Sequence, residues 1–477
     1  MMQCVQGKTM VNKGKKYRTE TDSMGDIRVP AESLYGAQTQ RAIDNFTISE
    51  ESLPWSFIKG LLLVKKSAAK TNATLKLLPQ DLASAIVDCV DRLLSTRPRD
   101  QFPVSVFQTG SGTSTNMNVN EVICGLAARN GVNLLPNDHV NFGQSSNDVI
   151  PTALHLSAAI QTRDRLLPAL DRLADELLQF GKAHSDVIKT GRTHLMDALP
   201  IRLQAELDGW VMQLLESCER IRDSLDRLQR LPLGGTAVGS GVNCHPDFPG
   251  KAITILNELT GLTFTRAPSL YKGISSLDTV VEFSGVLKAT ATALYKIAGD
   301  LRWMNSGPDA GLSEIRLKPL QPGSSIMPAK VNPVIPEAVC MAMAKVIGND
   351  ATIQVCGLGG NFQLNTMLPV AATAILDSIQ LLSGSCLSLA EKVIPHMRVD
   401  RETCKSKLLL NPLLVTSLNP IIGYMKAAEI AKTATRDKRP VLDVAKEMTD
   451  IPEADLERLL DPKNLADWQM EEEGKKH

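Results

Sequence analysis

Apolar residues recur at steps of three and four through the middle of the chain. Between residues 201 and 231 the apolar positions are Leu203, Leu207, Trp210, Leu214, Cys218, Ile221, Leu225 and Leu228. This spacing gives a helix one apolar stripe and leaves charged residues such as Glu216 and Asp223 on the opposite face. Similar patterns cover residues 152–184, 276–305, 334–356 and 366–394. Long helices separated by loops predict a helical bundle.

Shorter helical patterns lie on either side of these long ones. After the bundle region, the sequence predicts short helices at residues 425–437, 440–450 and 452–461. We therefore expect a mainly all-α protein with an N-terminal, mostly helical domain at 1–142, a central long-helix bundle at 143–401 and a small C-terminal helical domain at 402–477. The helix near 338–356 is apolar or small nearly all round, which predicts neighbours on every side and therefore oligomerisation.

The composition limits the classes of function. The chain has 477 residues, with 52 Lys plus Arg and 52 Asp plus Glu, so a zero net charge gives no reason to expect nucleic acid or a membrane surface as partner. Nine cysteines and seven histidines are scattered without CxxC or HxxxH spacing. This pattern predicts reduced thiols in a cytoplasmic protein and no metal site. The basic segment 1–20 lacks an apolar core, so we expect a disordered tail, with a short organelle-targeting role left open.

Four segments interrupt the helical patterns and are dense in Ser, Thr, Asn and Gly: 109–121, 143–152, 191–200 and 323–337. Each segment alone fits a helix N-cap, but capping needs only one side chain per helix. Together they favour an anion site, because helix N-termini, hydroxyls and amides supply donors and Lys330 supplies charge. The chain has no P-loop, and its TGSGTST segment is not the GxGxxG of a dinucleotide fold, so a small dicarboxylate fits better than a nucleotide.

His194 has two interpretations. A lone histidine is more often structural than catalytic, but this one follows Thr193 in a polar segment, and Glu337 ends the last of the four segments. A carboxylate that orients and charges an imidazole is a common acid–base device. The sequence leaves open whether the two side chains meet.

The segment GSSIMPAKVNP at 323–333 resembles the GSSxMPxKxNP signature of the fumarase/aspartase superfamily. The segments TGSGTSTNMNVNEVI, GQSSNDVIPTALH, GRTHLMDALPIRL, LGGTAVGSGVN and GNFQLN resemble class II fumarases in the family's order, so the resemblance covers nearly the whole chain. It implies a three-domain fold whose central five-helix bundle forms a twenty-helix core in a homotetramer. It also implies active sites shared between subunits and no cofactor or metal.

The resemblance implies fumarate hydratase activity, the reversible anti elimination of water from (S)-malate. Ser324 is then the base for the C3 proton, and Lys330 and Asn332 hold the carboxylate that becomes an aci-carboxylate. His194, charged by Glu337, handles the water. The remaining substrate-binding residues implied are Ser111, Thr113, Ser145, Ser146, Asn147 and Thr193.

Two alternatives remain open. MPAKVNPVIPE resembles aspartases as much as fumarases, so aspartate ammonia-lyase activity is the second reading, and a catalytically silent helical scaffold is the third. Two departures from the family pattern matter. Asp309 stands where Arg is common, and Leu135 stands where fumarases often carry His at a secondary dicarboxylate site, so the resemblance does not carry that site over.

Overall fold

The computed structural model describes residues 16–467, and the predictions for the extreme N-terminal tail lie outside these residues. The chain forms two compact units. Among the described residues, unit 1 comprises 16–166, Ile221–Lys288 and Val346–Gln380, and unit 2 comprises Leu167–Arg220, Ala289–Lys345 and 381–467. The predicted domain boundaries after residues 142 and 401 stay a prediction.

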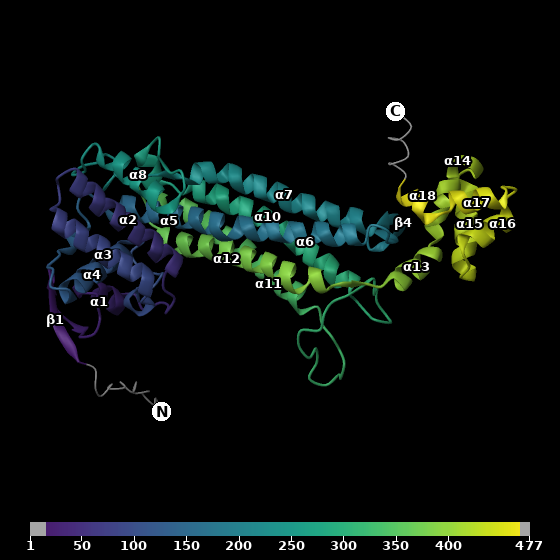
Figure 1. Cartoon of the computed structure of the whole chain (residues 1–477), viewed down its shortest axis with the longest axis horizontal. Helices are drawn as coiled ribbons and strands as arrows, with labels where there is room; N and C mark the ends of the chain where they lie inside the picture. The colour runs from purple at the N-terminus through teal and green to yellow at the C-terminus, as the bar shows by residue number, and fades with distance from the viewer. Residues whose placement is uncertain (1–15, 468–477) are drawn as a thin grey trace, which may run out of the picture. The chain divides into compact units, whose positions relative to one another are not determined.

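The predicted long helices are present and the fold is mainly helical (Figure 1). Four of them are α7 (Leu203–Leu228), α10 (Asp278–Met304), α11 (Val334–Leu358) and α12 (Leu368–Lys392). The helix predicted at 152–184 is observed as α5 (Ser146–Gln161), the π-helical η3 (Thr162–Leu166) and α6 (Leu167–Ala183), which follow one another directly. It begins earlier than predicted because Ser145 and Asp148 form a capping box at its start.

Unit 1 is built around one central helix, α2 (Trp55–Thr74), which packs against α3, α5 and α8. Leu61, Leu62 and Val64 of α2 are fully buried. Figure 1 shows α3 and α4 beside it. The other elements of this unit are β1 (Tyr17–Asp22), β2 (Gly25–Pro30), α1 (Ala37–Asn45), α3 (Gln80–Thr96), η1 (Arg99–Gln101), α4 (Thr113–Arg129), η2 (Pro136–Val140), β5 (Arg230–Leu231), α8 (Phe248–Thr260), β6 (Thr265–Arg266), α9 (Leu270–Ser275), β8 (Gly360–Asn361) and β9 (Leu364–Asn365).

Unit 2 contains an antiparallel hairpin of β3 (Ile188–Thr193) and β4 (Met196–Arg202) and the C-terminal short helices. The three helices predicted there are confirmed as α15 (Tyr424–Asp437), α16 (Val441–Met448) and α17 (Glu453–Leu459). They enclose their own apolar core around Leu418, Ile430, Val444 and Leu456. The remaining elements are β7 (Ile315–Arg316), η4 (Ile394–His396), β10 (Arg398–Val399), α13 (Arg401–Leu409), η5 (Pro412–Leu418), α14 (Asn419–Ile422) and α18 (Pro462–Ala466).

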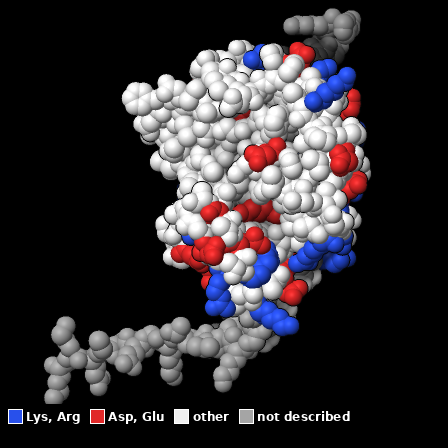
Figure 2. Space-filling view, turned by 90° about the vertical axis from the view of Figure 1, so that its left-hand side faces the viewer, with Lys and Arg blue, Asp and Glu red and all other residues white. Residues whose placement is uncertain are grey.

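One helical stretch among the described residues, Leu368–His396, is long and apolar enough to cross a membrane on length and composition alone. Its side chains Ile375, Ile379 and Leu382 are fully buried, as those of a core helix are. On the face viewed in Figure 2, Lys and Arg lie interspersed with Asp and Glu. That mixture agrees with the equal numbers of basic and acidic residues in the sequence.

Candidate functional site

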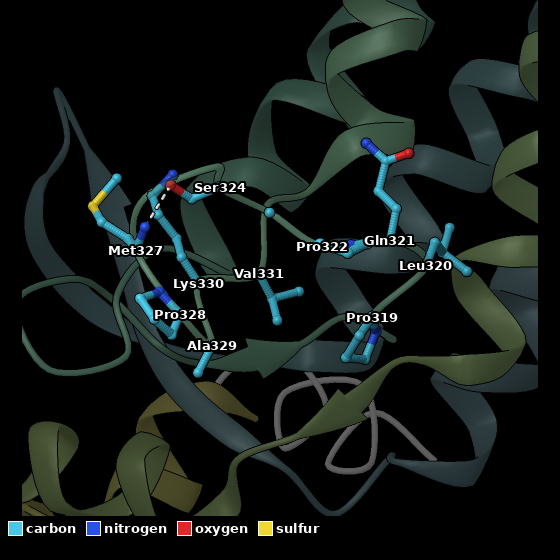
Figure 3. Close-up of a pocket in the computed structure, with 11 residues that line it drawn as sticks. Pro319, Leu320, Gln321, Pro322, Ser324, Met327, Pro328, Ala329, Lys330 and Val331 are labelled. Atoms are coloured by element: carbon cyan, nitrogen blue, oxygen red, sulfur yellow. Dashed lines mark hydrogen bonds between the residues drawn. The ribbon is translucent and has the colours of Figure 1, made fainter.

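The segment that carries Ser324 has no regular structure, as its sequence predicted. It lines a pocket of about 470 Å³ together with Pro319–Pro322 and Met327–Val331 (Figure 3). The Oγ of Ser324 accepts hydrogen bonds from the backbone N–H groups of Met327, at 3.0 Å, and Ile326, at 3.3 Å. Two donors directed at this oxygen favour its ionised form over its neutral form.

Lys330 and Asn332 close this segment on itself. The Nζ of Lys330 donates to Oδ1 of Asn332 at 2.6 Å, and Nδ2 of Asn332 donates to the carbonyl oxygen of Gly323 at 2.6 Å. A Cβ atom on Gly323 would lie 1.9 Å from the carbonyl oxygen of Lys330. The backbone at Gly323 lies so close to the backbone at Lys330 that this position requires glycine.

A larger groove of about 1470 Å³ in unit 2 is lined by Lys330, Asn332 and Glu337, the last from the first turn of α11. Its other charged or basic lining residues are Arg302, Arg316, Lys318, His396 and Arg398. Because these basic groups outnumber the one carboxylate, the groove favours an anionic ligand.

Thr193 and His194 lie at the tip of the β3–β4 hairpin, where the sequence had predicted only an irregular loop. His194 and Leu195 form its two-residue turn, with φ of 56° and 61°. Such a turn requires positive φ at both central residues, and Leu tolerates this conformation poorly. Both Thr193 and His194 are exposed, and no hydrogen bond or ion pair joins His194 to Glu337 within residues 16–467.

A cluster of ion pairs fixes the β3–β4 hairpin to the loop that contains Glu314. Glu314, only 2% exposed, forms ion pairs with Lys189 at 2.9 Å and with Arg192 at 2.7 Å. Burial alone would lower the pKa of Lys189, but the charges of Glu206 and Glu314 outweigh it and raise that pKa. Glu314 was not predicted from the sequence, since no local pattern indicates that an acidic residue in a loop is buried.

The remaining predicted residues lie in unit 1. The hydroxyls of Ser111 and Thr113 are 2.8 Å apart where α4 begins. Ser145 caps α5, because its Oγ accepts from the backbone N–H of Asn147 at 3.2 Å. Ser146 is buried and its Oγ accepts from Nδ2 of Asn116 at 3.0 Å. These five residues thus sit at the N-terminal ends of two helices, where free N–H groups attract anions.

Asp148 is a second residue that the sequence analysis missed. Its fully buried carboxylate accepts backbone N–H bonds from Ser145, Gly234 and Thr236 at 3.0, 2.8 and 3.0 Å. Burial raises the pKa of Asp148, against the opposing effect of these bonds. Asn147 adds a bond of 2.8 Å from Nδ2 to the carbonyl oxygen of Ala237. The start of α5 is therefore fastened to the LGGTAVG segment, and a capping Asp three residues after Ser145 is the signal that could have found it.

The structure thus separates the predicted residues into two groups. Ser111, Thr113 and Ser145–Asn147 belong to unit 1, whereas Thr193, His194 and Ser324–Glu337 belong to unit 2. Within residues 16–467, no three His, Cys, Asp or Glu side chains converge in a way that could hold a metal ion. Asp309, where the family commonly has Arg, is exposed.

Comparison with known proteins agrees with this fold and these segments. A lyase family model matches residues 25–348, and a model of the fumarase C C-terminus matches 414–467. The chain is 53% identical to fumarate hydratase class II 2 of Pseudomonas aeruginosa over 94% of its length and 98% of that protein. It is 51% identical to a class II fumarate hydratase of Xylella fastidiosa, covering 95% of this chain and 96% of that one. The crystal structure of class II fumarase from Schistosoma mansoni superposes with a TM-score of 0.91 at 35% identity, over 94% of this chain and 99% of that one.

The lyase family model matches more than half of the residues of this chain. The chain therefore belongs to that family of lyases. The curated relatives, which the chain matches over nearly their whole length, are class II fumarate hydratases, and the C-terminal segment matches the fumarase C model. Within the lyases the chain belongs to the class II fumarate hydratases.

Proposed function

We propose that this protein interconverts (S)-malate and fumarate by reversible anti elimination of water, at a site to which three different subunits contribute. Membership of the class II fumarate hydratases is the single observation that carries the reaction. The residue roles rest on the positions that match the family's motifs and on the contacts described above.

In the proposed elimination, Ser324 removes a proton from C3 of malate. The C3–H bond breaks, the proton moves to Oγ, and the electron pair passes into the neighbouring carboxylate, which becomes a doubly charged aci-carboxylate. The two backbone N–H groups on Ser324 Oγ support this role because they stabilise an ionised hydroxyl. The pocket around Ser324 is formed by an irregular segment, which can move and close over substrate more readily than a helix can.

Lys330 and Asn332 stabilise the new negative charge on that carboxylate. In the structure, Nζ of Lys330 and Nδ2 of Asn332 each donate a hydrogen bond of 2.6 Å within the segment. Both donors can exchange these acceptors for the oxygens of the substrate carboxylate. Removal of one such donor typically costs ~3 kcal/mol of transition-state stabilisation. The C2–O bond then breaks as the C2–C3 double bond forms. His194, charged by Glu337 of another subunit, delivers a proton through a bound water, so that the hydroxide leaves as water.

The other carboxylate of the substrate binds to Ser111, Thr113, Ser145, Ser146, Asn147 and Thr193. The first five lie at the starts of α4 and α5, whose N-termini supply backbone N–H groups and positive dipole ends. No step of this mechanism requires a cofactor.

The proposed assembly is a homotetramer with a shared helical core. Large apolar side chains on the long helices are exposed in the single chain, among them Trp303 at 53%, Met341 at 69% and Leu358 at 82%. A monomer rarely leaves such residues in water along its longest helices, which supports burial against other copies. A cytoplasmic location stays a prediction.

A direct assay tests the reaction. The purified protein is expected to convert malate to fumarate, followed by the ultraviolet absorbance of the new double bond, and to release no ammonia from aspartate. Ammonia release from aspartate with malate left unchanged would instead establish the aspartate ammonia-lyase alternative.

A further inference from the structure

Lys65 is an unusual residue for its place in the fold. It lies on α2, four residues after Leu61, on a helix whose side chains are buried nearly all round, and it is itself 0% exposed. A fully buried lysine occurs only where other groups compensate for the lost hydration of its charge. Here its Nζ donates to Oδ1 of Asn141 at 2.9 Å and to Oε1 of Gln144 at 3.1 Å.

Both acceptors belong to the turn that leads directly into Ser145, Ser146 and Asn147. Nδ2 of Asn141 donates to the carbonyl oxygen of Gln144 at 3.2 Å, and Nε2 of Gln144 donates to the carbonyl oxygen of Val140 at 3.0 Å. The side chains that hold Lys65 therefore also fix the backbone of this turn. Their orientation is coupled to the ammonium group, because it donates to both side-chain oxygens.

A second path links the same ammonium to Ser146. Oδ1 of Asn141 also accepts from Nδ2 of Asn116 at 3.1 Å and from Nδ2 of Asn120 at 3.3 Å. The same Nδ2 of Asn116 is 3.0 Å from the Oγ of Ser146. Asn116, Asn120 and Ser146 are all buried, so water cannot easily replace a bond lost from this network.

We propose that Lys65 is a positioning residue for the dicarboxylate: it fixes the turn that presents Ser145–Asn147, and its buried positive charge strengthens the binding of the dianion. This inference rests on the proposed function, in which that turn binds one substrate carboxylate. Lys65 does not touch substrate, and it acts through Asn141, Gln144 and Asn116.

The charge of Lys65 changes within the pH range of an ordinary assay. Burial lowers the pKa of Lys65 to about 7, although the carboxylate of Asp148 on α5 opposes that effect. Lys65 is thus charged below this pH and neutral above it, so binding of the dianion is expected to weaken as the pH rises.

Asp148 of α5 is the charged group that acts on Lys65, and burial raises the pKa of its carboxyl. The network of Lys65 otherwise consists of amide side chains from the turn and α4, and the buried residues of α8 are apolar. Glu121, the buried carboxylate of α4, instead accepts from the backbone N–H groups of Gly36, Gln38 and Thr39. Among the buried residues of α3, only Cys89 is titratable, and burial raises its pKa to about 11, so that thiol stays neutral at the pH values concerned.

The chain offers a matched control in the next residue. Lys66 lies on the same helix but pairs with Asp91 at the surface. Lys65→Met removes the charge and the donor at similar side-chain length, and Lys66→Met makes the same chemical change outside the network. Steady-state kcat and KM for malate would be measured for wild type and both variants from about pH 6 to about pH 8.5, a range in which small carboxylic acids are ionised.

The expected KM of wild type rises roughly tenfold across this range, whereas Lys65→Met has a KM about tenfold above wild type at the low end and nearly constant with pH. Its kcat changes much less than its KM, and Lys66→Met behaves as wild type. His194 is present in all three proteins, so it cannot cause a difference between them. Equal KM profiles for Lys65→Met and wild type would overturn the proposal. If Lys65→Met does not fold, a wild-type KM independent of pH overturns it equally.

One further variant distinguishes a failure of the proposed role of Lys65 from a failure of the proposed function. Asn147→Ala is expected to raise KM, because the proposed function has Asn147 contact substrate. A raised KM in Asn147→Ala with none in Lys65→Met refutes only the role of Lys65. An unchanged KM in Asn147→Ala refutes the proposed binding turn itself.

Discussion

The side-chain amide of Asn332 donates a hydrogen bond of 2.6 Å to the carbonyl oxygen of Gly323. This bond joins the end of the segment that carries the proposed base to the end that carries the proposed charge. It holds the two ends side by side although the segment has no helix or strand between them. The distance between Ser324 and the Lys330–Asn332 pair therefore depends on how closely the backbone approaches itself at Gly323.

Gly323→Ala is expected to reduce kcat for malate by about 10²-fold, because displacement of reacting groups by about 1 Å costs that much. The added Cβ would lie 1.9 Å from the carbonyl oxygen of Lys330, so one strand of the segment must move. Melting temperature is expected to stay nearly unchanged, since the segment contributes few buried apolar side chains. Gly250→Ala is the matched control, because nothing lies within 4 Å of a Cβ at that exposed position in α8. Equal kcat in Gly323→Ala and wild type would show that the close approach has no role in turnover.

Ser324→Ala is expected to lower kcat by ~10²–10⁴-fold, the usual contribution of a positioned proton-transfer group. The hydroxyl accepts only the backbone N–H groups of Ile326 and Met327 among its described contacts, so its loss should leave the oligomer and the melting curve nearly intact. Turnover, sedimentation and thermal unfolding would be measured on the same preparation. Retained turnover would rule out Ser324 as the base.

Glu314→Gln is expected to destabilise the protein by ~3 kcal/mol, because it removes the counter-charge that the buried Lys189 and the half-buried Arg192 share. The same change should lower activity, since the hairpin that these residues hold carries Thr193 and His194 at its tip. Chemical denaturation and malate turnover measure the two effects. Glu402→Gln, an exposed position on α13, supplies the control for loss of one negative charge. Similar unfolding midpoints in the two variants would contradict the importance of the buried cluster.

The sequence was a good guide to the long helices because their apolar spacing is a local property. The start of α7 and the end of α10 lie within a few residues of the predicted ranges. The resemblance likewise located the irregular segment around Ser324. The hairpin of β3 and β4 escaped prediction, since its pairing depends on contacts between strands rather than on a local period.

The supporting residues were harder to predict than the candidate site residues. Lys65 stands in LLLVKKSAAK among apolar neighbours, and its helical spacing from Leu61 is the only local sign that it is buried. Glu314 and Asp148 gain their significance from segments far away in sequence, such as Gly234 for Asp148. Such burial is decided by tertiary packing, which no window of a single sequence records.

His155 is expected to make the folded state sensitive to acid. The side chain is buried in α5, with Nδ1 2.8 Å from the carbonyl oxygen of Leu228, and burial lowers its pKa to about 4. An unfolded histidine has a pKa of about 6.5, so between these values the unfolded chain binds a proton that the folded chain does not. The free energy of unfolding therefore falls as the pH drops through this window, by ~1.4 kcal/mol per pH unit and ~2 kcal/mol by about pH 5.

His155→Gln removes this titratable group, so the stability of the variant should fall less between about pH 7 and about pH 5 than that of wild type. His245→Gln, at an exposed position, is the control and should follow wild type. Urea denaturation of the three proteins at both pH values measures the difference, and parallel losses in all three would mean that another group causes the acid sensitivity.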